Sequence, residues 1–322
     1  MSNVVLVLSP SKMEEMKKYY AASLVEKTPP GSLFAAKPAN CMITAYKSGK
    51  VLFQGAASDA EAGKWSAPAS AANKTAAKVS SVKTHRYSPP ANIGELSVVG
   101  SDEVGTGDFF GPMTVVAVYA KREHIPLLKE LGVKDSKNLK DTQIIEIASQ
   151  IKHVVPFSLL VCDNPKYNTM QAKGMSQGKM KALLHNQAIK HVIDKISPET
   201  PEAVLIDQFA QPDIFFNYLK GQELFKSDSI YLSTKAEGIH VGVAAASILA
   251  RYAFVKRFET LSEKAGFTIP KGAGPAVDEA AARLIHERGI SALNEFTKVH
   301  FANTEKAKGI YQKKYKGDRN HP

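Results

Sequence analysis

The sequence has 322 residues, 44% hydrophobic and 23% charged, which is the composition of a globular protein with one or two domains. A formal net charge of +11 and a pI near 9.4 favour a polyanionic partner, although charge alone fits a basic enzyme equally well. Two distant cysteines argue against a disulfide scaffold and a thiolate zinc site. With no leader-like or membrane-spanning apolar stretch, we expect a cytoplasmic protein with no membrane partner.

The first sixty or so residues predict a small α+β unit. A short apolar run over 4–8 predicts a strand, and Ser9-Pro10 is typical of the start of a helix, here expected over 11–24. Two further strands are expected over 41–46 and 51–54, joined by a hairpin turn at Lys47-Ser48-Gly49-Lys50. We therefore assign residues 1–63 to an N-terminal domain.

Residues 64–94 predict a flexible basic linker. Alanine, serine, proline and lysine dominate this stretch, and it contains no acidic residue. Its charge is explained most simply by solvation of a tether, and loose contact with phosphates is the alternative. The remaining residues, 95–322, are expected to form the second domain.

The second domain shows strand and helix patterns that suggest one sheet. After a hairpin over 97–118, strands are expected over 154–162, 203–206 and 229–233. The helical patterns lie over 122–131, 141–151, 178–196, 213–219, 241–258, 278–287 and 291–296. Such mixed strands followed by helices predict an α/β fold, with a mixed sheet flanked by helices on both faces.

Two adjacent carboxylates, Asp102 and Glu103, stand near the end of the first strand of the hairpin over 97–118. Neighbouring residues of a strand point to opposite faces of the sheet. We therefore expect the chain to leave its regular pleat here if both acids act together, and Gly100 and Gly105 would permit that.

Two more acids stand at element junctions. Asp207 follows four apolar residues that predict a buried strand, where it is either a functional carboxylate or a cap of the next turn. Glu237 lies between a strand and the helix that begins near residue 240, where complementing the helix dipole is the simpler explanation.

Taken together, Asp102, Glu103, Asp207 and Glu237 predict a metal site. Carboxylates without histidine or cysteine partners suit hard cations such as Mg²⁺ or Mn²⁺. Two such ions can activate a water and stabilise the leaving oxygen of a displacement at phosphorus. Because the acids repel one another without metal, some of them should have raised pKa values in the metal-free protein.

The turn Gly105-Thr106-Gly107 has two explanations. Its main-chain groups can approach a sugar-phosphate chain closely, including a ribose 2′-hydroxyl, or it is only a tight turn. It does not match a dinucleotide-binding motif, because Gly111 comes one residue too late and a strand follows where a helix is needed.

The arrangement of five motifs resembles ribonuclease HIII, a bacterial branch of the type-2 ribonuclease H family. The resemblance covers about residues 97–307. The motifs are Asp102-Glu103-Val104-Gly105-Thr106-Gly107 with Phe109-Phe110-Gly111-Pro112, Lys134-Asp135-Ser136-Lys137, Ile206-Asp207-Gln208-Phe209, Ala244-Ala245-Ala246-Ser247-Ile248-Leu249-Ala250, and His300-Phe301-Ala302-Asn303-Thr304. The resemblance implies a ribonuclease H fold and endonucleolytic cutting of the RNA strand of RNA/DNA hybrids. It also implies Mg²⁺ or Mn²⁺ as cofactor and 5′-phosphate and 3′-hydroxyl ends.

The resemblance also implies roles for single residues. Asp102, Glu103 and Asp207 correspond to metal ligands, and Glu237 to the fourth catalytic acid, where ribonuclease HII relatives have aspartate. Thr106 stands where those relatives have arginine or lysine, which implies poor cutting at single ribonucleotides embedded in DNA.

Six substrate-binding residues are expected from the same motifs: Gly105, Thr106, Gly107, Lys134, Ser136 and Lys137. For the last three, a solvated loop before a helix is the alternative. The N-terminal domain resembles the substrate-binding domain of the family, which is similar in fold to the TATA-box-binding protein.

Two other functions remain open from sequence. One is an HII-like enzyme specialised for embedded single ribonucleotides, against which Thr106 and Glu237 argue. The other is a non-catalytic nucleic-acid-binding protein, which would leave the four acids unexplained because bare carboxylates repel phosphate. We expect a monomeric enzyme with an RNA/DNA hybrid as its partner and no obligate protein partner.

Overall fold

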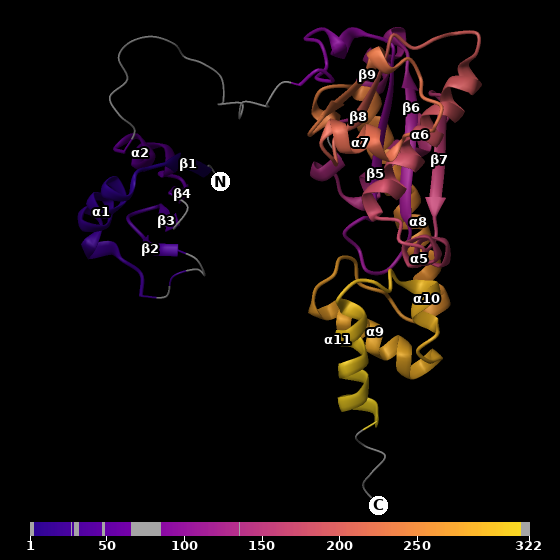
Figure 1. The fold of residues 1–322 in the computed structure, drawn as a ribbon. Helices are drawn as coiled ribbons and strands as arrows, with labels where there is room; N and C mark the ends of the chain where they lie inside the picture. The colour runs from indigo at the N-terminus through magenta and orange to yellow at the C-terminus, as the bar shows by residue number, and fades with distance from the viewer. Residues whose placement is uncertain are drawn as a thin grey trace, which may run out of the picture. The chain divides into compact units, whose positions relative to one another are not determined.

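The computed structural model describes residues 3–26, 28, 32–46, 49–65, 85–134 and 136–316. The chain forms two compact units, Met1–Val82 and Lys83–Pro322, which are drawn together in Figure 1 and are described separately below. In these described ranges no helix is both long and apolar enough to cross a membrane.

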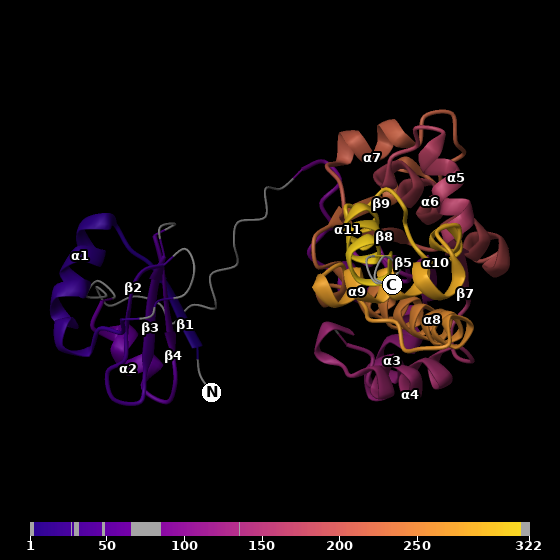
Figure 2. The ribbon, with the colours of Figure 1, turned by 90° about the horizontal axis from the view of Figure 1, so that it is seen from below.

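The N-terminal unit is a four-stranded antiparallel sheet with the order β1-β4-β3-β2. Its strands are β1 (Asn3–Val7), β2 (Ser32–Ala36), β3 (Met42–Tyr46) and β4 (Lys50–Gln54). Helices α1 (Pro10–Tyr19) and α2 (Ser58–Gly63) share an apolar core with the sheet. Figure 2 shows the ribbon of this unit from below. Val5 and Val7 alternate with this core and are 55% and 75% exposed, so part of the opposite face is apolar and open to solvent.

The expected α+β unit is confirmed, and its details differ. Strand β2 and helix α2 were not expected, and α1 ends at Tyr19, after which a short 3-10 helix, Ala21–Ser23, follows. The predicted hairpin joins β3 to β4, but residues 47 and 48 of its turn lie outside the described residues.

Both ends of the predicted linker pack onto a folded unit. Trp65 is buried in the N-terminal core, and its indole nitrogen donates to the Tyr20 hydroxyl at 3.1 Å. In the second unit, the Tyr87 ring lies against Phe216, and Ile93 of the 3-10 helix η2 (Ile93–Glu95) is buried. The expectation of flexibility is therefore wrong for Trp65 and for these residues, while 66–84 lie outside the described residues.

The second unit contains a five-stranded mixed sheet with the order β7-β6-β5-β8-β9. The strands are β5 (Val98–Val104), β6 (Met113–Ala120), β7 (Phe157–Cys162), β8 (Ala203–Asp207) and β9 (Ile230–Ser233). Strand β6 is antiparallel to β5 and β7, whereas β5, β8 and β9 are parallel. The carboxyl ends of these three parallel strands therefore meet at one edge of the sheet.

Helices cover both faces of this sheet, which confirms the predicted fold class (Figure 1). Alternate residues of β6 pack to opposite sides: Val115 and Ala117 face α6 and α7, and Val116 and Val118 face α3, α4 and α8. These helices are α3 (Ile125–Glu130), α4 (Asp141–Ile151), α6 (Gln177–Ile196), α7 (Pro212–Tyr218) and α8 (Val241–Ala265).

Helix α8 lies very close to β5 because Gly100 has no side chain. A Cβ atom at Gly100 would lie 2.3 Å from the Val243 nitrogen and 2.4 Å from the Gly242 carbonyl carbon, which are backbone atoms that cannot move aside. The run of small residues at the start of α8 permits the same close contact from the other side. Gly100 therefore serves helix–strand packing and not a break in the pleat.

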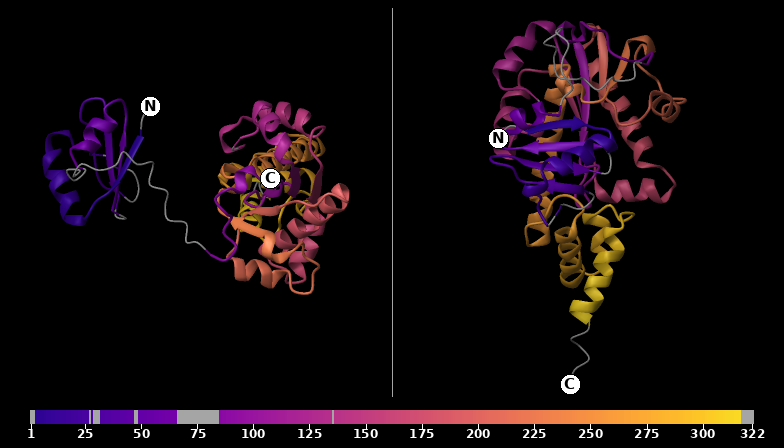
Figure 3. Two further views of the ribbon diagram at one scale, coloured as in Figure 1. Left: turned by 90° about the horizontal axis from the view of Figure 1, so that it is seen from above. Right: turned by 90° about the vertical axis from the view of Figure 1, so that its left-hand side faces the viewer.

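A helical subdomain continues from the end of α8 and is drawn in yellow in Figure 3. It consists of α9 (Pro275–Arg288), α10 (Ala292–Phe296) and α11 (Asn303–Tyr311), which pack with Phe254 and Phe258 of α8 around Phe109 and Phe110. Helix α11 and helix α5 (Asn164–Ala172) were not expected, and α8 extends seven residues beyond its predicted end at 258.

Candidate active site

Three parallel strands bring the predicted acids to one edge of the sheet. In the register of β5 with β8, Ser101 lies opposite Ile206, so the next residues along are Asp102 and Asp207. Asp207 in turn lies opposite Ser233 of β9, and Glu237 follows in the short 3-10 helix η6 (Ala236–Gly238). Four acids that are distant in sequence are thus collected by strand order.

The adjacent acids of β5 point to opposite faces, because the strand keeps its regular pleat. Asp102 pairs with Val116 and Glu103 with Val115 in an unbroken antiparallel register. The chain thus keeps its pleat, against our expectation, and the two carboxylates still interact, since the Glu103 charge raises the Asp102 pKa. Asp102 lies on the face covered by α8, and Glu103 on the face covered by α6.

Asp102 is a buried carboxylate without a cationic partner among the contacts the structure describes. It accepts hydrogen bonds from the Ser247 hydroxyl of α8 and from the Glu103 main-chain nitrogen, the latter at 2.7 Å. Burial raises its pKa well above the ordinary value, and the charges of Glu103 and Asp207 add to that rise. The predicted rise of pKa among the acids therefore holds for Asp102.

Asp207 and Glu237 lie next along this edge and have different partners. The Ala236 main-chain nitrogen donates to Asp207 Oδ1 at 2.9 Å, and burial together with the charges of Glu237 and Glu103 raises the Asp207 pKa. Lys137 Nζ lies 2.5 Å from Glu237 Oε1. The other oxygen, Oε2, is buried and has no hydrogen-bond partner in the described part of the chain. A buried carboxylate oxygen without a partner fits a cation ligand.

Glu103 has the opposite environment. Lys181 Nζ donates to its Oε1 at 2.9 Å, and His185 Nε2 donates to its Oε2 at 3.0 Å. Burial alone would raise the Glu103 pKa, but these two partners overcome it and lower the pKa to about 2. Both carboxylate oxygens of Glu103 are therefore occupied by side chains of α6.

The partners of each acid determine which of the acids are available to a metal ion. Within the described ranges, no group of three histidine, cysteine, aspartate or glutamate side chains is arranged to hold a metal ion as it stands. Three of the acids nevertheless have the required chemistry, since they are buried or half-buried carboxylates at one edge and one carries an unpartnered oxygen. Such oxygens suit a hard divalent cation.

Comparison with known proteins identifies the family. The family model described as "Ribonuclease HII" matches residues 99–304, and one described as "Domain of unknown function (DUF3378)" matches residues 3–78. The chain is 58% identical to ribonuclease HIII of Bacillus subtilis (strain 168), covering 98% of this chain and 99% of that protein. It is 59% identical to ribonuclease HIII of Bacillus cereus (strain ATCC 10987 / NRS 248), covering 95% and 98%. The chain belongs to the ribonuclease HIII family.

A solved structure supports the same assignment. The crystal structure of Bst-RNase HIII in complex with Mn²⁺ superposes with a TM-score of 0.70 and 47% identity, covering 97% of this chain and all of that one. The resemblance to ribonuclease HIII is thus confirmed, and this chain is a ribonuclease H, an endoribonuclease.

The glycine turn Gly105-Thr106-Gly107 is held from several sides. Gly105 is buried at φ +94°, and a Cβ there would lie 2.2 Å from the Pro112 carbonyl oxygen. Gln177 donates to the Thr106 carbonyl at 3.0 Å, and Gly107 is exposed. Of the three predicted substrate-binding residues here, Gly107 presents its backbone to solvent, Thr106 is half-buried, and Gly105 shapes the turn from within.

A buried lysine anchors the end of this loop. Lys298 Nζ donates to the Asp108 and Gly111 carbonyls at 2.8 and 2.6 Å, and burial lowers its pKa to about 8. The Asp108 carboxylate accepts from the Gly272 nitrogen at 2.6 Å. The loop before β6 is therefore tied to the C-terminal subdomain.

The predicted basic motif lies beside the acids in part. Lys137 pairs with Glu237, and Ser136 is buried with its Oγ 2.9 Å from the Ser247 Oγ. Ser136 thus supports the hydroxyl that contacts Asp102 and has no solvent-facing role. Lys134 is exposed, and Asp135 lies outside the described residues.

Two site residues were missed from the sequence. Lys181 and His185 contact Glu103, but they lie in a helix whose strongest sequence pattern is its apolar side. A signal was present, because these residues are four apart and share one helical face, and His185 stands among apolar neighbours. A buried histidine on such a face needs a polar partner.

Proposed function

We propose that this enzyme is an endonuclease that hydrolyses the RNA strand of RNA/DNA hybrids, leaving 5′-phosphate and 3′-hydroxyl ends. The observation that carries the proposal is the edge of buried acids, in which Asp102 and Asp207 have raised pKa values and Glu237 has an unpartnered oxygen. Family membership supports the activity, and the Mn²⁺ complex of Bst-RNase HIII supports a divalent cofactor, Mg²⁺ or Mn²⁺.

The four acids would hold the cofactor. Asp102, Glu103 and Asp207 are the proposed metal ligands and Glu237 the fourth catalytic acid; bound ions would activate the attacking water and stabilise the leaving oxygen. The chain itself orients these groups. The Ser247 hydroxyl fixes the Asp102 carboxylate, and the Ala236 nitrogen fixes that of Asp207.

The RNA strand would lie along the exposed part of the Gly105-Thr106-Gly107 turn. Main-chain groups at Gly107 are open to solvent and can approach a ribose 2′-hydroxyl. Lys137 and Lys134 are exposed basic side chains of the next loop that can contact phosphates. We also propose that the enzyme cuts poorly at single ribonucleotides embedded in DNA, since Thr106 is uncharged where the ribonuclease HII relatives have arginine or lysine.

The experiment is cleavage of end-labelled RNA/DNA hybrid with Mg²⁺ or Mn²⁺ and with chelator. We expect cuts in the RNA strand only, with 5′-phosphate and 3′-hydroxyl ends. Cleavage should be lost completely in chelator. Asp207→Asn should abolish cleavage but not hybrid binding, whereas Asp213→Asn, an exposed aspartate in the first turn of α7, should cut normally. Normal cutting by Asp207→Asn would refute the site, and activity in chelator would favour the non-catalytic or metal-free alternatives.

A second substrate distinguishes the proposed activity from that of an HII-like enzyme specialised for embedded single ribonucleotides. A duplex DNA with one ribonucleotide is compared with one that contains a block of four ribonucleotides. We expect efficient cutting only of the block. Equal cutting of the two substrates would refute the proposed preference.

The N-terminal unit is proposed to add affinity for the hybrid. Deletion of residues 1–82 should raise the Michaelis constant much more than it lowers the turnover number. Deletion of residues 1–90 is a less clean variant, because the Leu232 nitrogen donates to the Tyr87 carbonyl at 2.8 Å, and that contact would be lost as well. An unchanged affinity after deletion of 1–82 would refute this role.

We also propose a cytoplasmic monomer without an obligate protein partner. All the acids come from one chain, and Cys41 and Cys162 are buried free thiols, which suits a reducing compartment. Light scattering of the active enzyme should give the mass of one chain, 34.9 kDa.

A further inference from the structure

The ammonium group of Lys181 lies between a carboxylate and an aromatic ring and contacts both. Its Nζ lies 2.9 Å from Glu103 Oε1 and 4.1 Å from the centroid of the Phe209 ring. Lys181 is only 12% exposed and Glu103 only 11%. An ammonium held in this way on both sides is a specific contact and not a solvated surface pair.

His185 holds the same carboxylate from the other side and is itself fixed. Its Nδ1 lies 2.7 Å from the Ser101 hydroxyl, its Nε2 donates to Glu103 Oε2, and its ring stacks on Phe209 at 5.3 Å. The His185 side chain is completely buried. It therefore has no room to withdraw, whereas Lys181 has a flexible stem and some exposure.

A carboxylate oxygen that accepts from an ammonium group is not available to a metal ion in the same direction. Each Glu103 oxygen keeps a second lone pair, but a cation that joins Glu103 to Asp102 and Asp207 comes close to the Lys181 ammonium at Oε1, while His185 stays at Oε2. Two positive charges at one oxygen also repel each other strongly in a poorly solvated site. Metal binding and the Lys181 contact therefore compete.

We propose that Lys181 is an internal counter-ion of Glu103, which an incoming divalent cation displaces, so that Lys181 weakens metal binding in the absence of nucleic acid. Lys181 is thus a positioning residue that acts through Glu103. The inference rests on the proposed function, since it needs a metal at these acids. The Lys137 contact with Glu237 differs, because the Lys137 side chain is 69% exposed and can turn into solvent when a cation takes its place at Glu237.

The test is Mn²⁺ binding to the metal-free full-length protein without nucleic acid, measured by calorimetry and by the electron paramagnetic resonance signal of free Mn²⁺. Lys181→Met keeps an unbranched apolar side chain against Phe209 and removes the charge. We expect it to bind Mn²⁺ about tenfold more tightly than the wild type, while Lys181→Arg binds as the wild type does.

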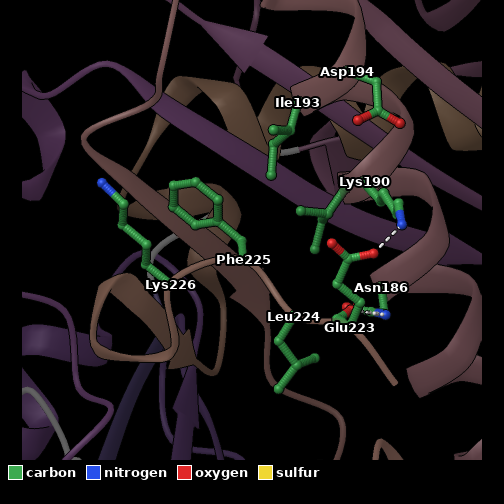
Figure 4. A pocket seen from close by; sticks show the side chains of 9 residues that line it. Asn186, Lys190, Ile193, Asp194, Glu223, Leu224, Phe225 and Lys226 are labelled. Carbon is green, nitrogen blue, oxygen red and sulfur yellow. Dashed lines mark hydrogen bonds and ion pairs between the residues drawn. The ribbon is translucent and has the colours of Figure 1, made fainter. Parts of the chain in front are cut away.

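A matched control lies on the opposite side of the same helix. Lys190 pairs with Glu223 at the rim of a hollow between α6 and the segment 223–226, as Figure 4 shows. Lys190→Met removes the same charge from α6 at an exposed ion pair and should leave Mn²⁺ affinity unchanged. Equal tightening in Lys190→Met would show that only the net charge matters, and it would overturn the inference.

Further variants keep the test decisive. In a Glu103→Gln background, Lys181→Met should no longer tighten Mn²⁺ binding, because the competing carboxylate is gone. If Lys181→Met does not fold, as judged by circular dichroism, Phe209→Leu removes the ring contact of Lys181 instead. That variant should tighten Mn²⁺ binding to a smaller extent. Unchanged or weaker binding in a folded Lys181→Met would overturn the inference while leaving the proposed function intact. Absence of Mn²⁺ binding in the wild type would overturn the metal site itself.

Discussion

Asp102 and Glu103 are neighbours in one strand, yet the protein treats their charges in opposite ways. On the α8 face, Asp102 accepts hydrogen bonds from a hydroxyl and a main-chain nitrogen, and burial raises its pKa. On the α6 face, Glu103 accepts hydrogen bonds from the Lys181 ammonium and the His185 imidazole, and its pKa falls to about 2 although it is buried too. The fold supplies positive charge to one acid and withholds it from the other.

This difference separates two ways of keeping acids together before a cation arrives. Four uncompensated carboxylates at one edge would repel one another severely. Here Glu103 is neutralised by the chain, and Asp102 and Asp207 are held with raised pKa values. The chain itself thus limits the repulsion among the acids before metal binds, and under the inference above a cation must displace Lys181 to gain Glu103.

The strongest test of the comparison is Asp102→Asn. Cleavage should fall about a thousandfold or more, because a metal ligand contributes several kcal/mol to the transition state. In chelator, however, the variant should be more stable than the wild type at neutral pH, since a buried charge is removed. Thermal unfolding in chelator measures this, and a loss of stability would show that Asp102 is compensated after all.

Glu103→Gln should have the opposite effect on stability. It leaves the Lys181 ammonium without its carboxylate, and breaking a buried pair in this way costs about 3–5 kcal/mol. Urea unfolding in chelator should show a loss of that order. The double variant Glu103→Gln, Lys181→Met should regain much of it, and failure to do so would mean that the ion pair is not what stabilises this face.

The pH dependence of stability should distinguish the two acids in the metal-free protein. Glu103 has a lowered pKa, about 2 against an ordinary 4.5, so its contribution is present above pH 4.5 and is lost as the pH falls toward 2. Asp102 has a raised pKa, so its protonated form contributes stability below its ordinary 3.8, and this is lost as the pH rises through the folded pKa. The deficit of Glu103→Gln should therefore shrink in acid, and the gain of Asp102→Asn should shrink in acid as well.

The smallest effect is expected at Lys137. Lys137→Gln removes the charged partner of Glu237, which is only 4% exposed, but keeps a hydrogen-bond donor, so stability should fall by about 1–2 kcal/mol, less than at Glu103. Hybrid binding should weaken a few-fold, and the slope of log affinity against log salt should fall by about one. Lys256→Gln, in an exposed pair with Glu259 on α8, is the matched control. An unchanged salt slope for Lys137→Gln would remove this lysine from the substrate surface.

Much of the catalytic unit was predictable because its elements carry strong local patterns. Helix α4 was predicted at the residues where it lies, and Asp207 was expected at the end of β8 because four apolar residues precede it. Strand β2 was missed because Ser32–Ala36 contains small residues that favour no pattern. Helix α11 was not placed because Asn303–Tyr311 has few large apolar side chains and shows no helical apolar period.

The site was predictable as a set of residues but not as a charge distribution. Which acids meet follows from strand order, and the motifs of the family supplied the set of acids but not that order. Whether each acid is neutralised depends on which side of the pleat it faces and on which helix covers that side, as Lys181 and Ser247 show. Such pairings join distant segments, so local periodicity carries no information about them.

The contact at Gly100 makes the geometry of the acids independent of ordinary core variation. Because backbone meets backbone there, the separation of β5 and α8 does not depend on the volume of any side chain. Ser247, one helical turn beyond Val243, is held at a constant height above Asp102 as a result. Changes of side-chain volume in the two apolar layers should therefore leave in place the hydroxyl that orients the first acid.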